Sequence, residues 1–392
     1  MIKNRYLYPS IITDLKNKMV FIGGPRQVGK TTLAQLVGKN NYEKYTYLNW
    51  DNREDRKIIL QGKFEAESTL IIFDEIHKYK QWKNYIKGEF DKYKKIFHIL
   101  VTGSARLDLY RKGGDSLIGR YYYYRLHPFS LAEVLQIKPD LKIFKELIFK
   151  KTKKNITKIF TDLLFFGGFP EPFIAKNDKI LRRFHNERLD RLVKEDIRDI
   201  EQVRDLSALQ ILTDILPDKV GSLLSLNALR EDLQVAHKTI SLWVNILEKF
   251  YYHFRIYPFL TKTIKSLRKE PKMYLWDWSQ IKNKGNRLEN MIASHLLKMS
   301  HFLYDTKGYK VELYFLRDLE GREVDFLVTV DKKPWMAIEV KSSDEQASKY
   351  LKYFVKKLNI PFAYQVVQQS KIDFYQNNIR IISADKFLSG LI

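Results

Sequence analysis

The sequence predicts an α/β protein whose N-terminal third is a parallel sheet. A short apolar run, Met19 to Ile22, leads through a Gly-rich segment into the helix-forming residues 32–37. A second apolar run, Leu70 to Phe73, is continuous and ends in two acidic residues. Continuous runs are typical of strands that are covered on both faces. Strands that alternate with helices are what right-handed parallel crossovers require.

The segment after the first strand has the pattern of a phosphate-binding loop. It runs from Gly24 to Thr32 with two glycines before a Lys-Thr pair: Gly24, Pro25, Arg26, Gln27, Val28, Gly29, Lys30, Thr31, Thr32. Glycines let the backbone N–H groups point inward, and the following helix adds partial positive charge. Lys30 can reach the β- and γ-phosphates, and the Thr31 hydroxyl can ligate Mg²⁺. A chance Gly-rich turn is disfavoured by the flanking strand and helix, so we expect ATP and Mg²⁺ here.

The acidic pair Asp74-Glu75 follows the second strand directly. In open α/β sheets ligands bind at the carboxyl ends of the strands, where both acids lie. We expect Asp74 to hold the hydration shell of Mg²⁺ and Glu75 to polarise the attacking water. A buried acid pair without a nearby cation would be costly, which favours the functional interpretation.

Further strands are predicted at residues 45–50, 96–102 and 121–126 of this first domain, 1–135. Thr102 and Ser104 follow a strand that should lie beside that of Asp74. A polar group there can touch the γ-phosphate or the attacking water. The alternative is ordinary turn chemistry, because Thr-Gly-Ser also ends strands.

Residues 136–205 lose the alternating pattern and become helical and charged, with a sharp break at 167–172. We expect this segment to be a helical lid that closes over the nucleotide.

Residues 206–272 have helix-turn-helix spacing. Two apolar helical faces flank a short connection at 234–236. His237, Lys238 and Ser241 would start the second helix, where base contacts are made. A basic stretch downstream would form the wing: Lys262, Lys265, Arg268, Lys269, Lys272. The predicted winged helix either contacts DNA or only packs against the ATPase domain.

Residues 273–392 carry a second acidic pattern. Glu289 lies on a predicted helix, Asp325 on a strand, and Glu339 and Lys341 share one face of the next strand. This is the spacing of restriction-endonuclease-like sites. The carboxylates would hold Mg²⁺ or Mn²⁺, and Lys341 would orient the hydrolytic water. Whether cleavage is retained stays open.

Composition narrows the functional classes. The 392 residues carry a formal charge of +23, which either indicates a polyanionic partner such as DNA or reflects Lys-rich usage. The absence of Cys excludes disulfides, Cys-ligated zinc and a thiol nucleophile. We see no apolar run near the ~18 residues of a membrane span and no signal-peptide core, and expect a cytoplasmic protein.

Nearly the whole chain resembles a prokaryotic family of AAA+ ATPases, abundant in archaea. Their C-terminal domain, of uncharacterised function, is related to PD-(D/E)XK nucleases. The segments that carry the resemblance are these: Gly24 to Thr31, Tyr47 to Asp51, Phe73 to His77, Thr102 to Ser104, Leu117 to Arg120, Gly167 to Pro170, Leu288 to Asn290, Glu323 to Asp325, Glu339 to Lys341.

The resemblance implies ATP binding and hydrolysis to ADP, with DNA as partner. It makes Thr102 and Ser104 the first sensor, and Arg120 an arginine finger that acts in a neighbouring subunit of a homo-oligomer. Arg106 is the alternative finger, and Arg120 could instead be a surface arginine paired with a carboxylate. For the second sensor, Arg182 and Arg183 are only candidates.

Two functions follow from these expectations. The first is a DNA-associated ATPase with a metal-dependent nuclease domain. The second is a regulatory ATPase whose winged-helix and nuclease-like domains bind DNA or protein partners without cutting.

Overall fold

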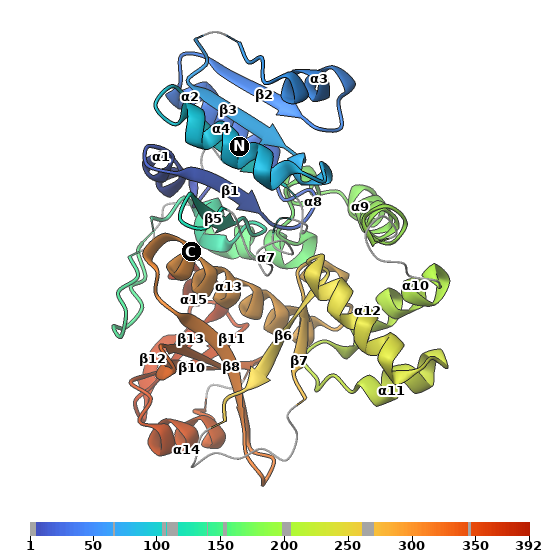
Figure 1. Cartoon of the computed structure of the whole chain (residues 1–392). Helices are drawn as coiled ribbons and strands as arrows, with labels where there is room; N and C mark the ends of the chain where they lie inside the picture. Colours follow the sequence, from blue (N-terminus) through green and yellow to red (C-terminus); the bar gives the residue numbers. More distant parts are fainter. Residues whose placement is uncertain are drawn as a thin grey trace. The chain divides into compact units, whose positions relative to one another are not determined.

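A computed structural model of the chain divides into two compact units, which are described separately (Figure 1). Unit 1 comprises residues 1–127 with 249–251, and unit 2 comprises 128–248 with 252–392. The described residues are 5–65, 67–103, 107, 117–138, 140–151, 155–197, 205–260, 270–343 and 346–392. None of the described helices is long and apolar enough to cross a membrane.

Unit 1 is built on a five-stranded, fully parallel sheet with the strand order β2-β3-β4-β1-β5. The strands are β1 (Met19–Gly23), β2 (Tyr45–Asn49), β3 (Leu70–Asp74), β4 (His98–Thr102) and β5 (Tyr121–Arg125). Asn49 pairs with Asp74, Asp74 with Thr102, and Thr102 with Ile22. The carboxyl ends of β1, β2, β3 and β4 therefore lie in register at one edge.

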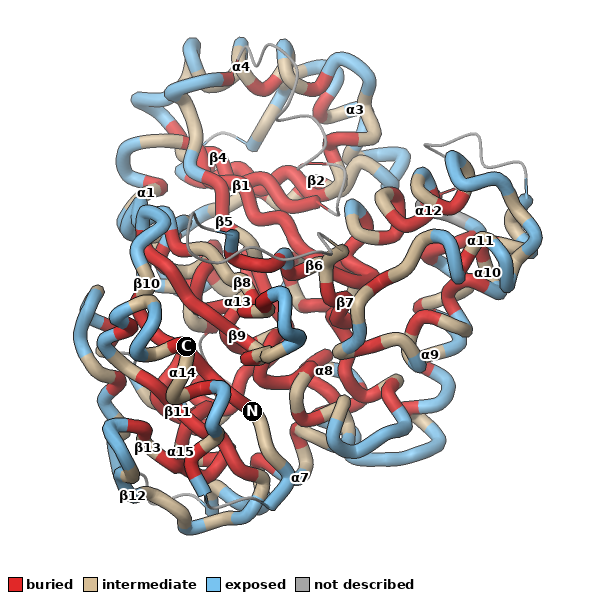
Figure 2. Tube along the Cα trace, turned by 90° about the horizontal axis from the view of Figure 1, so that it is seen from below, coloured by how far each residue is buried: buried red, intermediate tan, exposed pale blue. Residues whose placement is uncertain are grey.

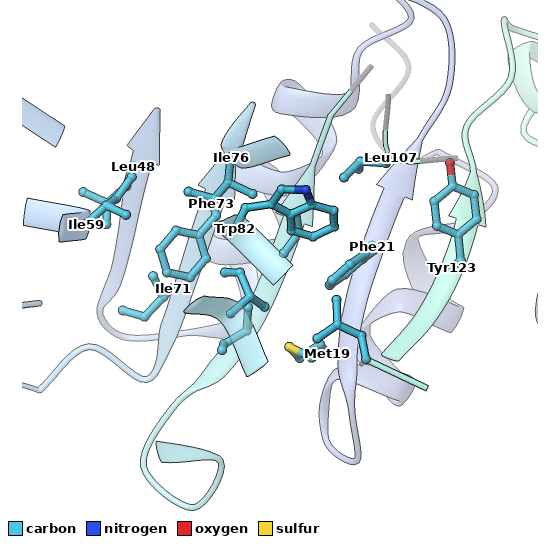
Figure 3. Packing of buried hydrophobic residues seen from close by; sticks show 14 of the residues in the cluster. Met19, Phe21, Leu48, Ile59, Ile71, Phe73, Ile76, Trp82, Leu107 and Tyr123 are labelled. Atoms are coloured by element: carbon cyan, nitrogen blue, oxygen red, sulfur yellow. The ribbon is translucent and has the colours of Figure 1, made fainter. Parts of the chain in front are cut away.

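Helices cover both faces of this sheet. They are α1 (Tyr8–Leu15), α2 (Lys30–Asn41), α3 (Arg53–Gln61), the short η1 (Ile76–Lys78) and α4 (Trp82–Tyr93). Figure 3 shows one layer, in which Phe21 and Phe73 of the strands pack with Trp82 and Ile59. The alternate strand residues face α1 and α2 and are also buried, as the red strands of Figure 2 show. The continuous apolar runs arise because neither face meets water.

Unit 2 contains an eight-stranded mixed sheet with the order β12-β13-β11-β10-β9-β8-β6-β7. The strands are β6 (His253–Pro258), β7 (Lys272–Leu275), β8 (Val311–Arg317), β9 (Glu323–Val330), β10 (Lys333–Lys341), β11 (Phe362–Val367), β12 (Asp373–Gln376) and β13 (Ile379–Ser383). β8, β9 and β10 are antiparallel, whereas β10, β11 and β13 are parallel.

Three helices of unit 2 pack on this sheet: α13 (Lys284–Lys307), α14 (Lys349–Leu358) and α15 (Ala384–Ser389). On β11, Ala363 belongs to the apolar cluster of α14, whereas the ring of Tyr364 lies against Phe387 of α15. Successive strand side chains point to opposite faces, so α14 and α15 cover opposite faces of the sheet.

The segment expected to form a lid, residues 136–205, contains α7 (Ile156–Phe166), α8 (Pro170–Ala175), α9 (Asp178–Arg191) and the π-helical η3 (Leu192–Ile197), and α6 (Leu131–Leu135) directly precedes it. α6 contacts α15, and α7 contacts both α13 and α15. The indole N–H of Trp278 also donates to the Leu163 carbonyl at 2.9 Å. These two helices are thus part of the packing of unit 2, and closure over a nucleotide stays a prediction.

The predicted winged-helix segment contains α10 (Leu206–Ile215), η4 (Leu216–Lys219), α11 (Leu226–Leu233) and α12 (His237–Lys249), followed by the β6-β7 hairpin and then η5 (Trp278–Gln280). β6 also pairs in parallel with β8, through Tyr257 and Tyr314. The boundary that we expected at residue 272 therefore falls inside a continuous sheet, because the hairpin shares its backbone hydrogen bonds with the C-terminal strands.

Candidate functional site

The loop between β1 and α2 is fixed by two glycines with positive φ. Gly24 has φ 144°, and a Cβ built on it would lie 2.4 Å from the Leu126 carbonyl oxygen. Gly29 has φ 95° immediately before α2 begins at Lys30. Only glycine combines such a backbone with such a close approach. The local fold is the strand, turn and helix that a phosphate-binding loop needs.

A residue outside the motif, Arg5, also anchors this loop. Val28 is fully buried, and its carbonyl accepts a hydrogen bond from the Arg5 guanidinium at 2.8 Å. Arg5 also donates to the His127 carbonyl. Sequence reasoning missed Arg5, because nothing in the local pattern of the N-terminus points to a partner so far along the chain. Thr32 is exposed on α2, and Arg26 is half-buried.

Lys30 folds back over the loop that precedes it. Its side chain is buried, and Nζ donates to the Gly24 carbonyl at 3.1 Å and to the Pro25 carbonyl at 2.7 Å. An ammonium in this position is held at the site where the loop would receive phosphate oxygens. Phosphate oxygens carry full charge and make stronger bonds to an ammonium than carbonyls do.

Asp74 is the centre of a hydroxyl network at the carboxyl edge of the sheet. Its Oδ2 accepts from Thr31 Oγ1 at 2.7 Å and from the Tyr47 hydroxyl at 2.8 Å. Its Oδ1 accepts from Thr102 Oγ1 at 2.5 Å. β4 lies between β1 and β3, which brings Thr102 beside Asp74 while Thr31 reaches it from α2.

This arrangement fits Mg²⁺, because a hydroxyl and a carboxylate oxygen converge next to the phosphate-binding loop. Thr31 and Asp74 are the residues that would hold the ion. Tyr47 is an addition that the sequence did not reveal. Burial and the adjacent Asp74 raise the pKa of Tyr47, so its hydroxyl stays protonated and donates.

Glu75 occupies a left-handed backbone conformation, with φ 56°. Burial raises the pKa of Glu75, Lys30 opposes that rise, and Asp74 adds to it. Its Oε2 lies 3.5 Å from His77 Nε2 and 3.8 Å from Lys78 Nζ. A carboxylate with a raised pKa beside the nucleotide edge suits a general base. His77 was not among the expected site residues, although it belongs to the same motif.

The sensor and finger assignments can be placed only in part. Thr102 is fully buried, and its hydroxyl donates a hydrogen bond to Asp74. Ser104 and Arg106 lie outside the described residues. The candidates Arg182 and Arg183 are both exposed on α9.

Arg120 precedes β5, at the amino edge of the sheet, since Tyr121 pairs with Met19 at the start of β1. Five strand residues, or about 15 Å, separate this edge from the phosphate loop. Arg120 makes two hydrogen bonds to Asp91 of α4, at 2.9 Å and 3.1 Å. Its side chain therefore faces away from the nucleotide edge of its own subunit.

In unit 2 the acidic residues converge on a lysine. Lys272 Nζ lies 2.7 Å from Glu323 Oε1, 3.4 Å from Asp325 Oδ1 and 3.7 Å from Glu289 Oε1. Its side chain is only 3% exposed. We had expected Lys272 to belong to the basic stretch that forms the wing. Its burial corrects that expectation, and the other basic residues of the wing lie outside the described part.

Glu339 and Lys341 form a second pair at the same end of β10. Lys341 Nζ lies 2.8 Å from Glu339 Oε1, and the Val340 amide donates to Asp325 Oδ2 at 2.9 Å. Burial and the nearby Asp325 raise the pKa of Glu289 and of Glu339, each to about 7. Asp325 therefore acts on both of these carboxyls.

These residues do not fit the divalent ion that the sequence led us to expect. Among the described residues, no three His, Asp or Glu side chains are arranged to hold a metal ion. The position that Glu289 and Asp325 share is filled by the Lys272 ammonium. The signal that could have revealed it is a lysine at the head of the apolar run 273–276.

The helix-turn-helix residues lie where expected. α11 ends at Gln234 in a left-handed conformation, and α12 begins at His237. His237 and Lys238 are exposed at its first turn, and Ser241 is half-buried. This local geometry leaves the first turn of α12 accessible, and DNA contact there stays a prediction.

Comparison with known proteins gives three family matches along the chain. Residues 16–135 match an AAA domain. Residues 157–282 and 284–387 match two separate domains of unknown function. The first segment is therefore an AAA-type ATPase domain, a class that binds and hydrolyses ATP, and it coincides with the strands and loop that surround Asp74. The nuclease relationship of the last segment is not among these matches.

Similar proteins are known from archaea and bacteria. The uncharacterized protein MJ1544 of Methanocaldococcus jannaschii is 24% identical, over 87% of this chain and 79% of its own length. The uncharacterized protein Rv2008c of Mycobacterium tuberculosis is 22% identical, over 81% of this chain and 69% of its own. Among solved structures, the RuvB Holliday junction branch migration motor of Thermotoga maritima aligns with 64% of this chain and 87% of its own, at 19% identity and a TM-score of 0.32. That score is too low to support an argument about fold or function.

Proposed function

We propose that this protein is a Mg²⁺-dependent ATPase that acts as a nucleotide-driven switch on DNA. The observation that carries the ATPase part is the convergence of Thr31, Thr102 and Tyr47 on Asp74, beside a Lys30 that already covers the phosphate loop. The AAA match of residues 16–135 supports the same activity.

Each side chain has a separate task in this proposal. The amides of residues 24–29 and the Lys30 ammonium bind the phosphate oxygens. Mg²⁺, when bound through Thr31 and Asp74, neutralises charge on the β- and γ-phosphates. Thr102 holds the orientation of Asp74, and Glu75 accepts the proton of the attacking water. Burial of Asp74 and Thr102 excludes competing water from this edge.

The DNA part of the proposal is supported by a basic surface on α14. Four lysines, Lys349, Lys352, Lys356 and Lys357, occupy this ten-residue helix, which contains no acidic residue. Among the described residues, none of these lysines forms an ion pair. Tyr350 is exposed beside them. Closely spaced ammonium groups and an exposed ring suit a phosphate backbone and unstacked bases.

The experiment measures ATP hydrolysis and DNA binding in the full chain. Hydrolysis should require Mg²⁺ and should disappear in Lys30→Ala. DNA affinity should fall with salt, and Lys352→Gln with Lys356→Gln should reduce the salt slope by roughly 0.9 for each phosphate that is no longer neutralised. The matched control is Lys158→Gln with Lys179→Gln, two exposed lysines of α7 and α9. Equal slopes in both double variants would contradict the α14 assignment.

The second candidate is an ATPase whose C-terminal domain cuts DNA. It is favoured by the order along the chain of Glu289 on α13, Asp325 on β9, and Glu339 with Lys341 on β10. Mg²⁺-dependent cutting of plasmid or branched DNA by the wild type, but not by Asp325→Ala, would establish it. DNA binding without any cutting would instead support the regulatory switch.

A further inference from the structure

The acidic cluster of unit 2 is partly neutralised by lysine and arginine side chains of the same unit. Lys272 belongs to β7 and is buried among Glu289 of α13 and Glu323 and Asp325 of β9. On one side, Arg317 lies 2.6 Å from Glu323 Oε2. On the other, Lys341 pairs with Glu339. Four carboxylates therefore face three fixed positive side chains.

Two oxygens of the cluster also accept hydrogen bonds from uncharged donors. Glu289 Oε1 accepts from the Tyr274 hydroxyl at 2.7 Å, and Asp325 Oδ2 accepts from the Val340 amide at 2.9 Å. Gly221 closes the side of Glu289, since a Cβ there would lie 3.2 Å from each carboxylate oxygen. A divalent ion needs several converging oxygens at about 2.1–2.6 Å and would stand against an ammonium here.

One oxygen of Glu339 has a different environment. Glu339 Oε2 is buried and has no hydrogen-bond partner among the described residues. A single carboxylate oxygen cannot make a divalent site, and the other oxygen of the same group is taken by Lys341.

We infer that the Lys272 ammonium stands permanently where a divalent cation would bind, so that the C-terminal domain takes up no Mg²⁺ or Mn²⁺ and cuts no DNA. Its acidic residues instead form a charged joint that fastens β7 to α13 and β9. This inference does not depend on ATP hydrolysis or on the DNA surface of α14, because it concerns separate residues.

The test measures Mn²⁺ binding by the full chain without nucleotide. All proteins carry Asp74→Asn, which removes the carboxylate of the ATP site as a metal ligand. Free Mn²⁺ is followed by electron paramagnetic resonance, and the thermal unfolding midpoint is measured with Mn²⁺ and with EDTA. We expect no stoichiometric Mn²⁺ binding that depends on Asp325 and no shift of the midpoint.

A second set of variants tests whether Mn²⁺ binds when the Lys272 ammonium is removed. Adding Lys272→Met, which keeps the length but removes the charge, should create one equivalent of Mn²⁺ binding and a metal-dependent rise of the midpoint. Asp325→Asn should abolish both again. Lys272→Arg is the matched control, which keeps the positive charge and should gain no binding.

Two results would overturn the inference. One is a stoichiometric Mn²⁺ site in the chain with native Lys272 that disappears on Asp325→Asn. The other is a folded Lys272→Met chain that still binds no Mn²⁺. If Lys272→Met does not fold, Lys272→Gln replaces it. Failure of both to fold, with no Mn²⁺ bound by the chain with native Lys272, would support the charged joint.

Discussion

Glu75 combines a left-handed backbone with a half-buried carboxyl, and both features cost free energy that the fold has to offset. Such a conformation costs on the order of 1–3 kcal/mol, and it recurs at active sites. The Glu75 amide donates to the Thr102 carbonyl at 3.0 Å, which holds this turn against β4. The strain therefore places the carboxyl at the strand edge beside Asp74.

A first prediction separates binding from turnover at this residue. Glu75→Gln should bind ATP normally but lose hydrolysis by roughly 10²–10⁴-fold, because only the proton acceptor changes. Lys30→Ala should weaken ATP binding itself. Single-turnover hydrolysis and fluorescent-nucleotide titration measure the two effects. Equal hydrolysis by Glu75→Gln and wild type would refute the assignment of the base.

A second prediction concerns a buried ion pair in unit 2. Lys298 Nζ lies 2.6 Å from Glu133 Oε2, and both side chains are fully buried. Lys298→Met should lower the free energy of unfolding by about 3–5 kcal/mol, because it leaves Glu133 buried without its cation.

Urea unfolding measures this loss. The double variant Lys298→Met with Glu133→Leu is the control, and it should recover part of the lost stability. A single variant as stable as the wild type would contradict this role of the ion pair.

At the scale of elements, the two ends of β5 lie at opposite edges of the parallel sheet. Its carboxyl end lies beside the phosphate loop, since Arg125 pairs with Gly23, whereas Arg120 lies at the opposite end. An arginine placed this way lies too far from the phosphate loop to act on the nucleotide of its own subunit.

The third prediction follows from this position. Arg120→Ala should lower the hydrolysis rate by roughly 10³-fold or more, the order found for arginine fingers, and leave nucleotide affinity nearly unchanged. Specific activity of the wild type should rise with protein concentration as subunits associate. Asp91→Asn, which removes the intramolecular partner only, is the control. A monomer whose specific activity is independent of concentration would count against the finger.

The elements that the sequence predicts well are those whose contacts are local or whose pattern is contained in a short stretch of the chain. β1, β3 and β4 are continuous apolar runs because both faces of their sheet are buried, and the phosphate loop needs a fixed spacing. The pairing of β6 with β8 could not be predicted, because β8 begins more than fifty residues later in the chain.

The same limit applies to single side chains. Tyr47 reaches Asp74 only because β2 lies beside β3, and Arg5 reaches Val28 only through the folded N-terminus. Asp325 and Glu289 were recognisable from their spacing. Their neutralising partner was not, because a lysine looks like a surface residue until the fold surrounds it.

At the scale of the whole molecule, two buried histidines make stability depend on pH. Burial lowers the pKa of His253 to about 4 and that of His295 to about 3. Both rings are hydrogen-bonded in neutral form: His253 Nε2 to the Val244 carbonyl, and His295 Nε2 from the Leu131 amide. The unfolded chain binds these protons near pH 6.5, whereas the folded chain does not.

The fourth prediction is the sign of this dependence. Because both folded pKa values are depressed, their contribution is complete above pH 6.5 and is lost as the pH falls below it. Each histidine should cost roughly 2 kcal/mol of unfolding free energy between pH 6.5 and pH 5. Urea unfolding of unit 2 at both pH values measures the loss, and His253→Gln or His295→Gln should each reduce it. A pH dependence unchanged in both variants would disprove this origin.

The joint at Lys272 also decides where the chain can be divided. A fragment that starts at residue 273 would cut β7 after its first residue and discard the one ammonium that Glu289, Glu323 and Asp325 share. The fragment would then carry a surplus of half-buried negative charge that the intact protein does not have. Any cation that the fragment binds would therefore reflect the loss of Lys272 and not a property of the native domain. A fragment in which this cluster keeps its native charges must therefore include Lys272 and the rest of β7.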